Sequence, residues 1–411
     1  MDSASLRVNA NRLWASLEAM AEIGATAAGG CNRQALTDLD RQGRDLFVRW
    51  AGEASCSVEV DEVGNLFARR PGSDPAAPPV LAGSHLDTQA TGGKYDGVYG
   101  VLAGIEVLRV LAENAVQTRA PIEVAVWTNE EGCRFAPAML GSGVVSGTYS
   151  RDFAYAVKDK DGLTFRDELE RIGYLGTRPA TPQTYAAMFE AHIEQGPILE
   201  KEGLTIGAVT DIQGAYWFDV TFTGQSCHAG PTPMEMRRDP WEAALPVMAG
   251  AFALARANGP WGRATIGDVR VEPGSRNTVP ARLVVSIDIR HPDAGTLEGM
   301  VGALRALVDR ECAARGIAGA IDQVWHMPAT TFDAALAERV AAAAERLGHS
   351  CMKIVSGAGH DSLHTAQFAP TTMIFVPCAG GLSHNEAEAA TMGDLAAGAD
   401  VLLQVMLEAA G

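Results

Sequence analysis

Three short apolar runs in this chain each end in a polar segment, and this arrangement restricts the fold more than any other feature. The runs are residues 79–83, 122–127 and 371–376, and the segments that follow them contain His, Asp, Asn and Glu. Between the first two runs, residues 97–114 carry apolar side chains at the spacing of a helix. Alternating strands and helices predict an α/β sheet, in which ligands bind beyond the carboxyl ends of the strands. We therefore expect the functional site in these polar segments.

The middle of the chain has a different pattern. From about residue 212, strand-like and helix-like segments follow one another in the order βαββαβ. This order is typical of a small α+β sandwich. We expect such a sandwich at residues 212–328, inserted into a larger domain that residues 1–211 and 329–411 form together.

Composition argues against several classes of partner and location. Among 411 residues, 50 acidic and 33 basic side chains give a net charge of −17. Such a surface repels phosphate backbones and anionic lipids, so we expect neither nucleic acid nor a membrane as a partner. The longest nearly uninterrupted apolar stretch, residues 243–255, is too short to span a bilayer, and residues 1–14 lack the apolar core of a signal peptide. Seven cysteines without a Cys-x-x-Cys pair favour reduced thiols and hence a cytoplasmic protein.

The polar segments concentrate residues that can bind metal ions: His85, Asp87, Asp96, Glu130, Glu131, His192 and His384. Histidine nitrogens combined with carboxylate oxygens suit Zn, Mn, Co or Ni better than Ca or Mg. An aspartate between two such half-sites can bridge two ions about 3.5–4 Å apart. Of two adjacent glutamates, one can bind a metal ion while the other accepts a proton from water. Asp87 is expected to orient the imidazole of His85.

Each of these signals has a simpler interpretation when it is taken alone. A His-x-Asp sequence after a strand is more often a loop hydrogen bond, and a Glu-Glu pair usually lies on a solvated surface. A Gly-rich segment such as residues 92–97 is ordinarily a turn. Their occurrence together, at the ends of expected strands, favours a metal site instead.

The motifs resemble those of the M20-type binuclear metallohydrolases, in the branch of N-carbamoyl-L-amino-acid hydrolases, β-ureidopropionases and allantoate amidohydrolases. The matching segments run in family order over almost the whole chain. They are GSHLDT (83–88), GGKYDGVYGVLAG (92–104), TNEEGCRF (128–135), GSGVVSG (141–147), AHIEQGP (191–197), HAGPTPMEMRRDP (228–240), SRNTVPA (275–281), DIRH (288–291), SGAGHDS (356–362) and GLSHNEAE (381–388). The resemblance implies a discontinuous catalytic domain of the metallo-aminopeptidase type, with a mixed sheet and an inserted lid and dimerisation domain.

The resemblance also implies a role for each residue of the metal site. One divalent ion would be held by His85, Asp96 and His192, and a second by Asp96, Glu131 and His384. Glu130 would be the general base and Asp87 the partner of His85. The expected cofactors are thus two divalent ions per subunit (Zn, Mn, Co or Ni). Relatives that act as peptidases or deacylases usually carry a carboxylate in place of His192, whereas the carbamoylase branch carries the histidine.

Five substrate-binding residues follow from the same resemblance. They are His228, Asn277 and Arg290 in the insert, and Gln195 and His360 in the larger domain. Arg290 can grip a substrate carboxylate with two parallel hydrogen bonds, and the alternative is a salt bridge to Asp288 or Glu272. His228 can donate to the developing oxyanion and so act in catalysis, and the alternative is a loop histidine bonded to backbone.

The function implied is hydrolysis of the carbamoyl C–N bond of N-carbamoyl-L-amino acids, or of N-carbamoyl-β-alanine, to an amino acid, CO2 and ammonia. An allantoate amidohydrolase is the first alternative, because it would use the same metals and base. A dipeptidase or N-acyl deacylase is disfavoured by His192. A catalytically dead metal-binding protein is disfavoured because neither Glu130 nor a ligand is missing. The resemblance further implies a homodimer through the inserted domain.

Overall fold

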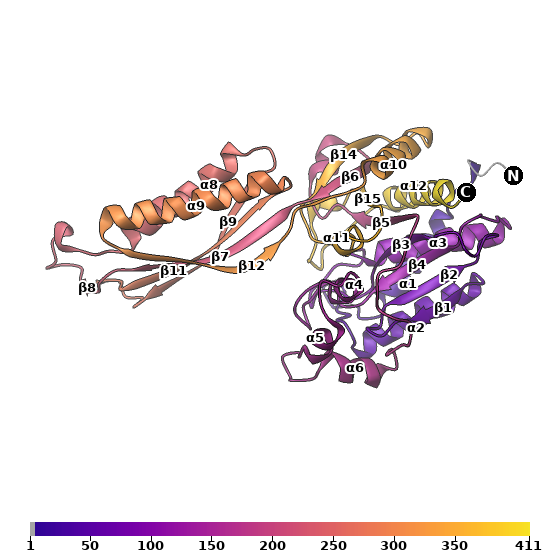
Figure 1. Ribbon diagram of the computed structural model, residues 1–411, viewed down its shortest axis with the longest axis horizontal. Helices are drawn as coiled ribbons and strands as arrows, with labels where there is room; N and C mark the ends of the chain where they lie inside the picture. The colour runs from indigo at the N-terminus through magenta and orange to yellow at the C-terminus, as the bar shows by residue number, and fades with distance from the viewer. Residues whose placement is uncertain (1–4) are drawn as a thin grey trace. The chain divides into compact units, whose positions relative to one another are not determined.

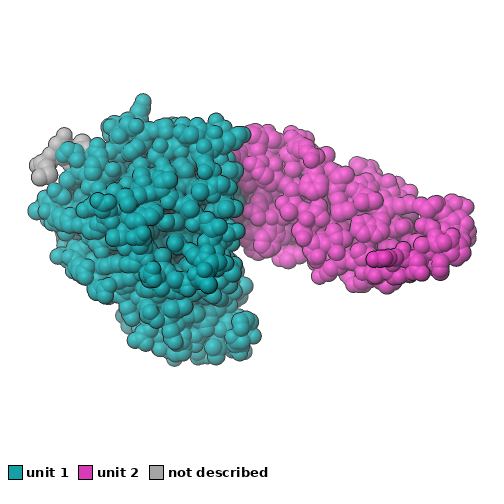
Figure 2. Space-filling model, turned by 180° about the vertical axis from the view of Figure 1, so that it is seen from behind, with its two compact units in different colours: residues 1–210, 332–411 teal, residues 211–331 magenta. Residues whose placement is uncertain are grey.

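The computed structural model describes residues 5–411, which divide into two compact units (Figure 2). The first unit comprises the chain up to Thr210 together with Phe332–Gly411, and the second comprises Asp211–Thr331. The insert expected from the sequence spans residues 212–328, so the two sets of boundaries differ by one residue at the start and three at the end.

A mixed sheet organises the first unit (Figure 1). The described residues form nine strands in the order β1-β2-β4-β3-β5-β15-β6-β13, with β14 paired to β6. The bounds are β1 (Ser57–Val60), β2 (Leu66–Arg70), β3 (Val80–His85), β4 (Ile122–Trp127), β5 (Ala187–Ile193), β6 (Ile206–Ile212), β13 (Thr330–Thr331), β14 (Cys351–Ser356) and β15 (Thr371–Val376). The neighbours β4, β3, β5 and β15 run parallel, whereas β1, β2 and β6 pair antiparallel. The expected α/β sheet of mixed direction is confirmed.

The four parallel strands form the centre of this unit because every residue in them is buried. Strands covered on both faces have continuous apolar runs, which is the pattern seen in the sequence. The helices are α1 (Ala10–Ala21), α2 (Asp38–Glu53), α3 (Val98–Glu113), α4 (Leu140–Val145), α5 (Arg151–Ala156), α6 (Phe165–Ile172), α7 (Ile198–Glu202), α10 (Ala334–Arg346), α11 (Ser362–Thr365) and α12 (Met392–Ala410). Helices α3 and α12 pack against β3 and β5 and against each other. Residues 97–114, expected to be helical, contain α3.

The second unit is a four-stranded antiparallel sheet covered by two helices. The sheet has the order β12-β7-β11-β9. Its elements are β7 (Gly214–Thr223), α8 (Trp241–Ala257), β9 (Arg263–Glu272), β11 (Arg282–His291), α9 (Ala294–Arg315) and β12 (Ala318–Met327), with a small ribbon of β8 (Cys227–His228) and β10 (Thr278–Val279). Helices α8 and α9 pack together over a core that includes Phe218, Val247 and Leu304.

Asp239 supports the start of α8, although the residue directly before the helix is Pro240. Asp239 still accepts a hydrogen bond from the Trp241 N–H at 3.0 Å, so it satisfies the first turn from one residue further back. None of the helices within residues 5–411 combines the length and apolar character that crossing a bilayer requires.

Candidate metal centre

The candidate ligands converge because the strands that carry them are parallel neighbours. His85 is the last residue of β3, and His192 lies one residue before the end of β5. Glu130 and Glu131 follow β4, and His384 follows β15. Parallel strands end at one edge of the sheet, so the segments after them meet there.

Three groups of potential ligand atoms form among the described residues: two contain Asp96 and match the expected metal sites, and the third comprises Glu190, His192 and His360. The first metal group comprises His85, Asp96 and His192, and the second comprises Asp96, Glu131 and His384; in each, the ligand atoms lie within 4.8 Å of one another. Asp96 Oδ1 lies 3.2 Å from His192 Nε2 and 3.6 Å from His85 Nε2. Asp96 Oδ2 lies 3.4 Å from His384 Nε2, which is 3.2 Å from Glu131 Oε2. One carboxylate therefore presents an oxygen to each group.

The histidines of the first metal group have the tautomer that metal binding requires. His85 Nδ1 lies 2.9 Å from the Asp87 carbonyl oxygen, and His192 Nδ1 lies 2.9 Å from the Ile193 carbonyl oxygen. A carbonyl can only accept, so each Nδ1 carries a proton, and the neutral ring then has its lone pair on Nε2. The Gly97 N–H donates to His192 Nε2 at 3.0 Å, which agrees with an unprotonated Nε2. The residues present fit divalent metal ions.

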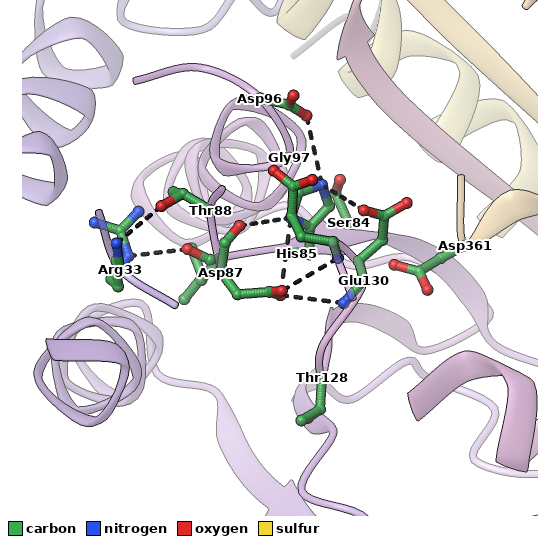
Figure 3. Close-up of polar contacts among 12 residues, drawn as sticks. Arg33, Ser84, His85, Asp87, Thr88, Asp96, Gly97, Thr128, Glu130 and Asp361 are labelled. Carbon is green, nitrogen blue, oxygen red and sulfur yellow. Dashed lines mark hydrogen bonds and ion pairs between the residues drawn. The ribbon is translucent and has the colours of Figure 1, made fainter. Parts of the chain in front are cut away.

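Asp87 holds the site in a different way from the one expected. Its carboxylate Oδ1 lies 3.9 Å from His85 Nδ1, beyond hydrogen-bonding distance, and its backbone carbonyl orients the imidazole instead. The Asp87 carboxylate accepts from the backbone N–H groups of Glu130 at 3.3 Å and Glu131 at 3.2 Å (Figure 3). Burial raises the pKa of Asp87 to about 6. Asp87 thus couples the ends of two neighbouring strands.

Glu130 lies beside the first metal group and interacts electrostatically with a second buried acid, Asp361. Glu130 Oε2 is 3.5 Å from His85 Nε2, and Glu130 is 8% exposed. Burial, together with the carboxylates of Asp361, Glu131 and Asp96, raises the pKa of Glu130 well above its ordinary value, against the opposing effect of His85. A carboxylate with a raised pKa is suited to accept and return a proton near neutral pH.

Gly97 gives the backbone room beside His85. It has a φ of 67°, and a Cβ placed there would lie 2.2 Å from His85 Nε2. A side chain at this position would occupy the space next to the ligand atom. The glycine is therefore required both by conformation and by the approach of the imidazole.

Two residues expected to bind substrate lie beside the metal groups. Gln195 donates through Nε2 to Asp96 Oδ2 at 2.8 Å, and its Oε1 is buried without a partner among the described residues. The ring of His360 lies 4.5 Å from that of His192, and its Nε2 is 3.1 Å from Ser356 Oγ. Burial lowers the pKa of His360 well below its ordinary value, so the ring is neutral.

The second unit holds the other three expected residues. His228 is the last residue of β8 and pairs with Thr278 of β10, and Asn277 lies directly before β10, where its carbonyl accepts from the Ala229 N–H at 2.9 Å. His228 is exposed, and its Nδ1 accepts from the Gly230 N–H at 3.1 Å. Arg290 lies on β11 and forms an ion pair with Asp288, with Nη2 2.7 Å from Oδ2. The local salt bridge considered as the alternative for Arg290 is therefore present.

Comparison with known proteins places the chain in a family. Residues 81–408 match peptidase family M20/M25/M40. The chain belongs to this family. The M20 resemblance inferred from the motifs is thereby confirmed.

Several proteins similar to this chain are named amidohydrolases or amidases. An N-carbamoyl-L-amino-acid amidohydrolase of Rhizobium meliloti is 50% identical over 404 residues, covering 98% of this chain and 97% of the relative. An N-carbamoyl-L-amino acid amidohydrolase of Geobacillus stearothermophilus is 35% identical over 407 residues, covering 98% and 99%. The crystal structure of an amidase of the hydantoinase/carbamoylase family from Burkholderia multivorans superposes with a TM-score of 0.96 at 51% identity, covering 99% of each chain.

Sequence reasoning assigned no role to several polar residues of this M20 site. Asp361 accepts a hydrogen bond from Ser142 Oγ, and its charge contributes to the raised pKa of Glu130. Glu190, two residues before His192, accepts from Ser84 Oγ at 2.8 Å and from Ser362 Oγ at 2.5 Å. All five of these residues lie in or beside the quoted motifs, but a motif does not tell which side chains touch.

Proposed function

We propose that this chain hydrolyses the carbamoyl C–N bond of N-carbamoyl-L-amino acids, giving the amino acid, CO2 and ammonia. The observation that carries the proposal is Glu130, which lies 3.5 Å from a ligand atom of the first metal group yet belongs to neither group. A buried carboxylate beside a metal site is the arrangement that hydrolysis of an unactivated amide needs. His192 as the third donor of the first group, and the activity for which the Rhizobium meliloti relative is named, support the carbamoyl compound as substrate.

The two metal groups are proposed to hold two divalent ions of Zn, Mn, Co or Ni, with Asp96 between them. When bound, these ions would supply Lewis-acid polarisation of the ureido carbonyl. His85 and His192 would bind through Nε2, since Nδ1 of each is engaged by a backbone carbonyl. Glu131 and His384 would complete the second group.

A side chain of the protein, Glu130, transfers the proton during the reaction. Glu130 accepts a proton from the attacking water as the water oxygen bonds to the ureido carbon. It returns this proton to the amino-acid nitrogen as the C–N bond breaks, and the carbamic acid released then decomposes to CO2 and ammonia. Asp87 keeps Glu130 and Glu131 in place through their backbone N–H groups. Burial raises the pKa of Glu130 above its ordinary value, which makes this carboxylate a stronger proton acceptor.

Arg290, Asn277, His228, Gln195 and His360 are proposed as substrate-binding residues, with His228 also stabilising the oxyanion. Arg290 would bind the substrate carboxylate. The second unit is proposed as a lid and as the surface of a homodimer, and the protein as cytoplasmic. Light scattering tests the dimer, since an active monomer contradicts it.

The substrate is tested by release of amine and ammonia from a panel of compounds. Protein reconstituted with Mn or Co is offered N-carbamoyl-L- and D-amino acids, N-carbamoyl-β-alanine, allantoate and an N-acetyl-L-amino acid. Turnover of the N-carbamoyl-L compounds above the others supports the proposal. A preference for allantoate keeps the metal site and base but contradicts the substrate, and a preference for the N-acetyl compound contradicts carbamoyl hydrolysis altogether.

A further inference from the structure

Asp96 is the residue on which both metal groups depend. It is common to the two groups, with Oδ1 facing His85 and His192 and Oδ2 facing His384. It lies in the loop that joins β3 to α3, directly before Gly97. Whatever fixes this loop therefore sets the geometry of both groups at once.

Glu388 fixes the backbone of this loop from a distant part of the chain. Its Oε1 accepts the N–H groups of Tyr95 at 2.8 Å and of Asp96 at 3.2 Å. Tyr95 and Glu388 are 293 residues apart in sequence, and Glu388 is only 4% exposed. A buried carboxylate that accepts two consecutive backbone N–H groups holds both peptide planes in one orientation.

The second oxygen of Glu388 reaches the side chain of Asp96 through Ser383. Ser383 Oγ lies 3.1 Å from Glu388 Oε2 and 2.9 Å from Asp96 Oδ2. Gln195 Nε2 also contacts both Ser383 Oγ, at 3.1 Å, and Asp96 Oδ2, at 2.8 Å. Glu388 is thus linked to Asp96 twice, once through the backbone and once through a hydroxyl.

Gly93 leaves the space that the Glu388 carboxyl group occupies. A Cβ built on Gly93 would lie 2.0 Å from Glu388 Cδ and 2.1 Å from its Oε1. The backbone of Gly93 is not in the left-handed region, so the glycine is required for space rather than for conformation. A side chain at position 93 and the observed place of this carboxyl group exclude each other.

We propose that Glu388 is a positioning residue that fixes Asp96 for both metal groups, acting through the Tyr95 and Asp96 amides and Ser383. The inference rests on the proposed metal binding and adds a residue that binds no metal itself. A purely structural role for Glu388 would lower the stability of the metal-free protein and leave metal affinity unchanged. Metal affinity therefore separates the two explanations.

The test is titration of the metal-free protein with Zn²⁺ alone, in competition with a chromophoric chelator. Glu388→Ala should weaken binding of both ions by about 10- to 100-fold, the range found for groups that orient metal ligands. Glu388→Gln should stay within about threefold of the wild type, because the amide oxygen can accept both N–H groups and the amide nitrogen can donate to Ser383. Glu386→Ala is the matched control, since Glu386 lies two residues away and contacts the Thr26 hydroxyl instead.

Gly93→Ala gives an independent test that leaves the carboxylate in the chain. It should weaken binding of both ions as Glu388→Ala does, because the new methyl group displaces the carboxyl group. In the double variant, Gly93→Ala should add nothing to the loss caused by Glu388→Ala, whereas independent effects would multiply.

Three results would overturn the inference. The first is wild-type affinity for both ions in Glu388→Ala, and the second is multiplying losses in the double variant. The third is an equal loss in Glu388→Gln and Glu388→Ala, which would point to the charge rather than to positioning. A wild-type protein that binds no Zn²⁺ would overturn the proposed metal site together with this inference, so the two failures can be told apart.

Discussion

Replacing Arg33 with methionine tests how the loop before the metal site is held. Arg33 is 1% exposed, and its guanidinium donates to the carbonyls of Leu86 at 2.9 Å, Met20 at 2.8 Å and Ile23 at 2.7 Å. The backbone N–H of Arg33 donates to Thr88 Oγ1 at 2.8 Å (Figure 3). Arg33 therefore forms hydrogen bonds to both sequence neighbours of Asp87, Leu86 and Thr88. Methionine keeps the apolar stem and removes the charged donors.

The expected loss follows from these contacts. The bond to Leu86 has a charged donor and contributes about 1.5–3 kcal/mol. The Met20 and Ile23 carbonyls also accept from Ile23 N and from Cys31 Sγ, so losing Arg33 costs about 0.5–1.5 kcal/mol at each. These are net values that already include the desolvation of the guanidinium, so the three bonds together contribute about 2.5–6 kcal/mol. We expect Arg33→Met to lower the free energy of unfolding by about that amount, or the melting temperature by about 4–10 °C.

Thermal unfolding of the metal-free protein measures this loss, and Arg41→Met is the matched control. Arg41 forms an exposed pair with Asp45, at 3.8 Å with both side chains more than half exposed, and such pairs contribute under about 1 kcal/mol. If the melting temperature of Arg33→Met lies within about 1 °C of the wild-type value, the reasoning is refuted.

Three further changes have definite expected outcomes. Glu130→Gln should lower kcat by about 10²–10⁴-fold with metal content unchanged, and activity near the wild-type value would contradict its role as the base. Removing metal with a chelator should abolish turnover and lower the melting temperature, with recovery of both when Zn²⁺ or Mn²⁺ is added back; turnover that survives complete removal would exclude metal from the reaction. Burial lowers the pKa of His364 to about 4, so the unfolded chain binds more protons than the folded one as pH falls from about 6.5 to 4. His364→Gln should therefore lose less stability than the wild type between pH 7 and pH 5, by about 2 kcal/mol, and identical pH dependence of the two melting temperatures would contradict this.

The parts of the site that the sequence predicts are those in which side-chain type and strand position coincide. Continuous apolar runs identified β3, β4 and β15, and the polar residues after them include His85, Glu131 and His384. Since parallel strands end at one edge, position along the chain was sufficient to bring these ligands together. The helical spacing of residues 97–114 likewise identified α3, which begins at Val98 and ends at Glu113.

The parts that the sequence did not predict act through backbone atoms. The Asp87 carbonyl orients His85, and the Asp87 carboxylate accepts from two backbone N–H groups. Arg33 and Glu388 also bind mainly backbone carbonyls or amides of distant segments. Every residue has such groups, so no pattern of side chains reveals which of them a given carboxylate or guanidinium will meet.

The separation of Glu388 from the loop it holds has a consequence for the order in which the site can form during synthesis. All three donors of the first metal group lie within residues 85–192, but the second group needs His384, and the Asp96 loop needs Glu388. The first set is complete once His192 has been made, and the stretch from His192 to Glu388 (388 − 192 = 196 residues) takes about 10–40 s to translate at 5–20 residues per second. During that interval a nascent chain can present one complete set of donors while the loop of Asp96 is not yet held by Glu388. The two ions proposed for this site would then be acquired in sequence, the first while the chain is still being made and the second only after the segment around Glu388 has emerged.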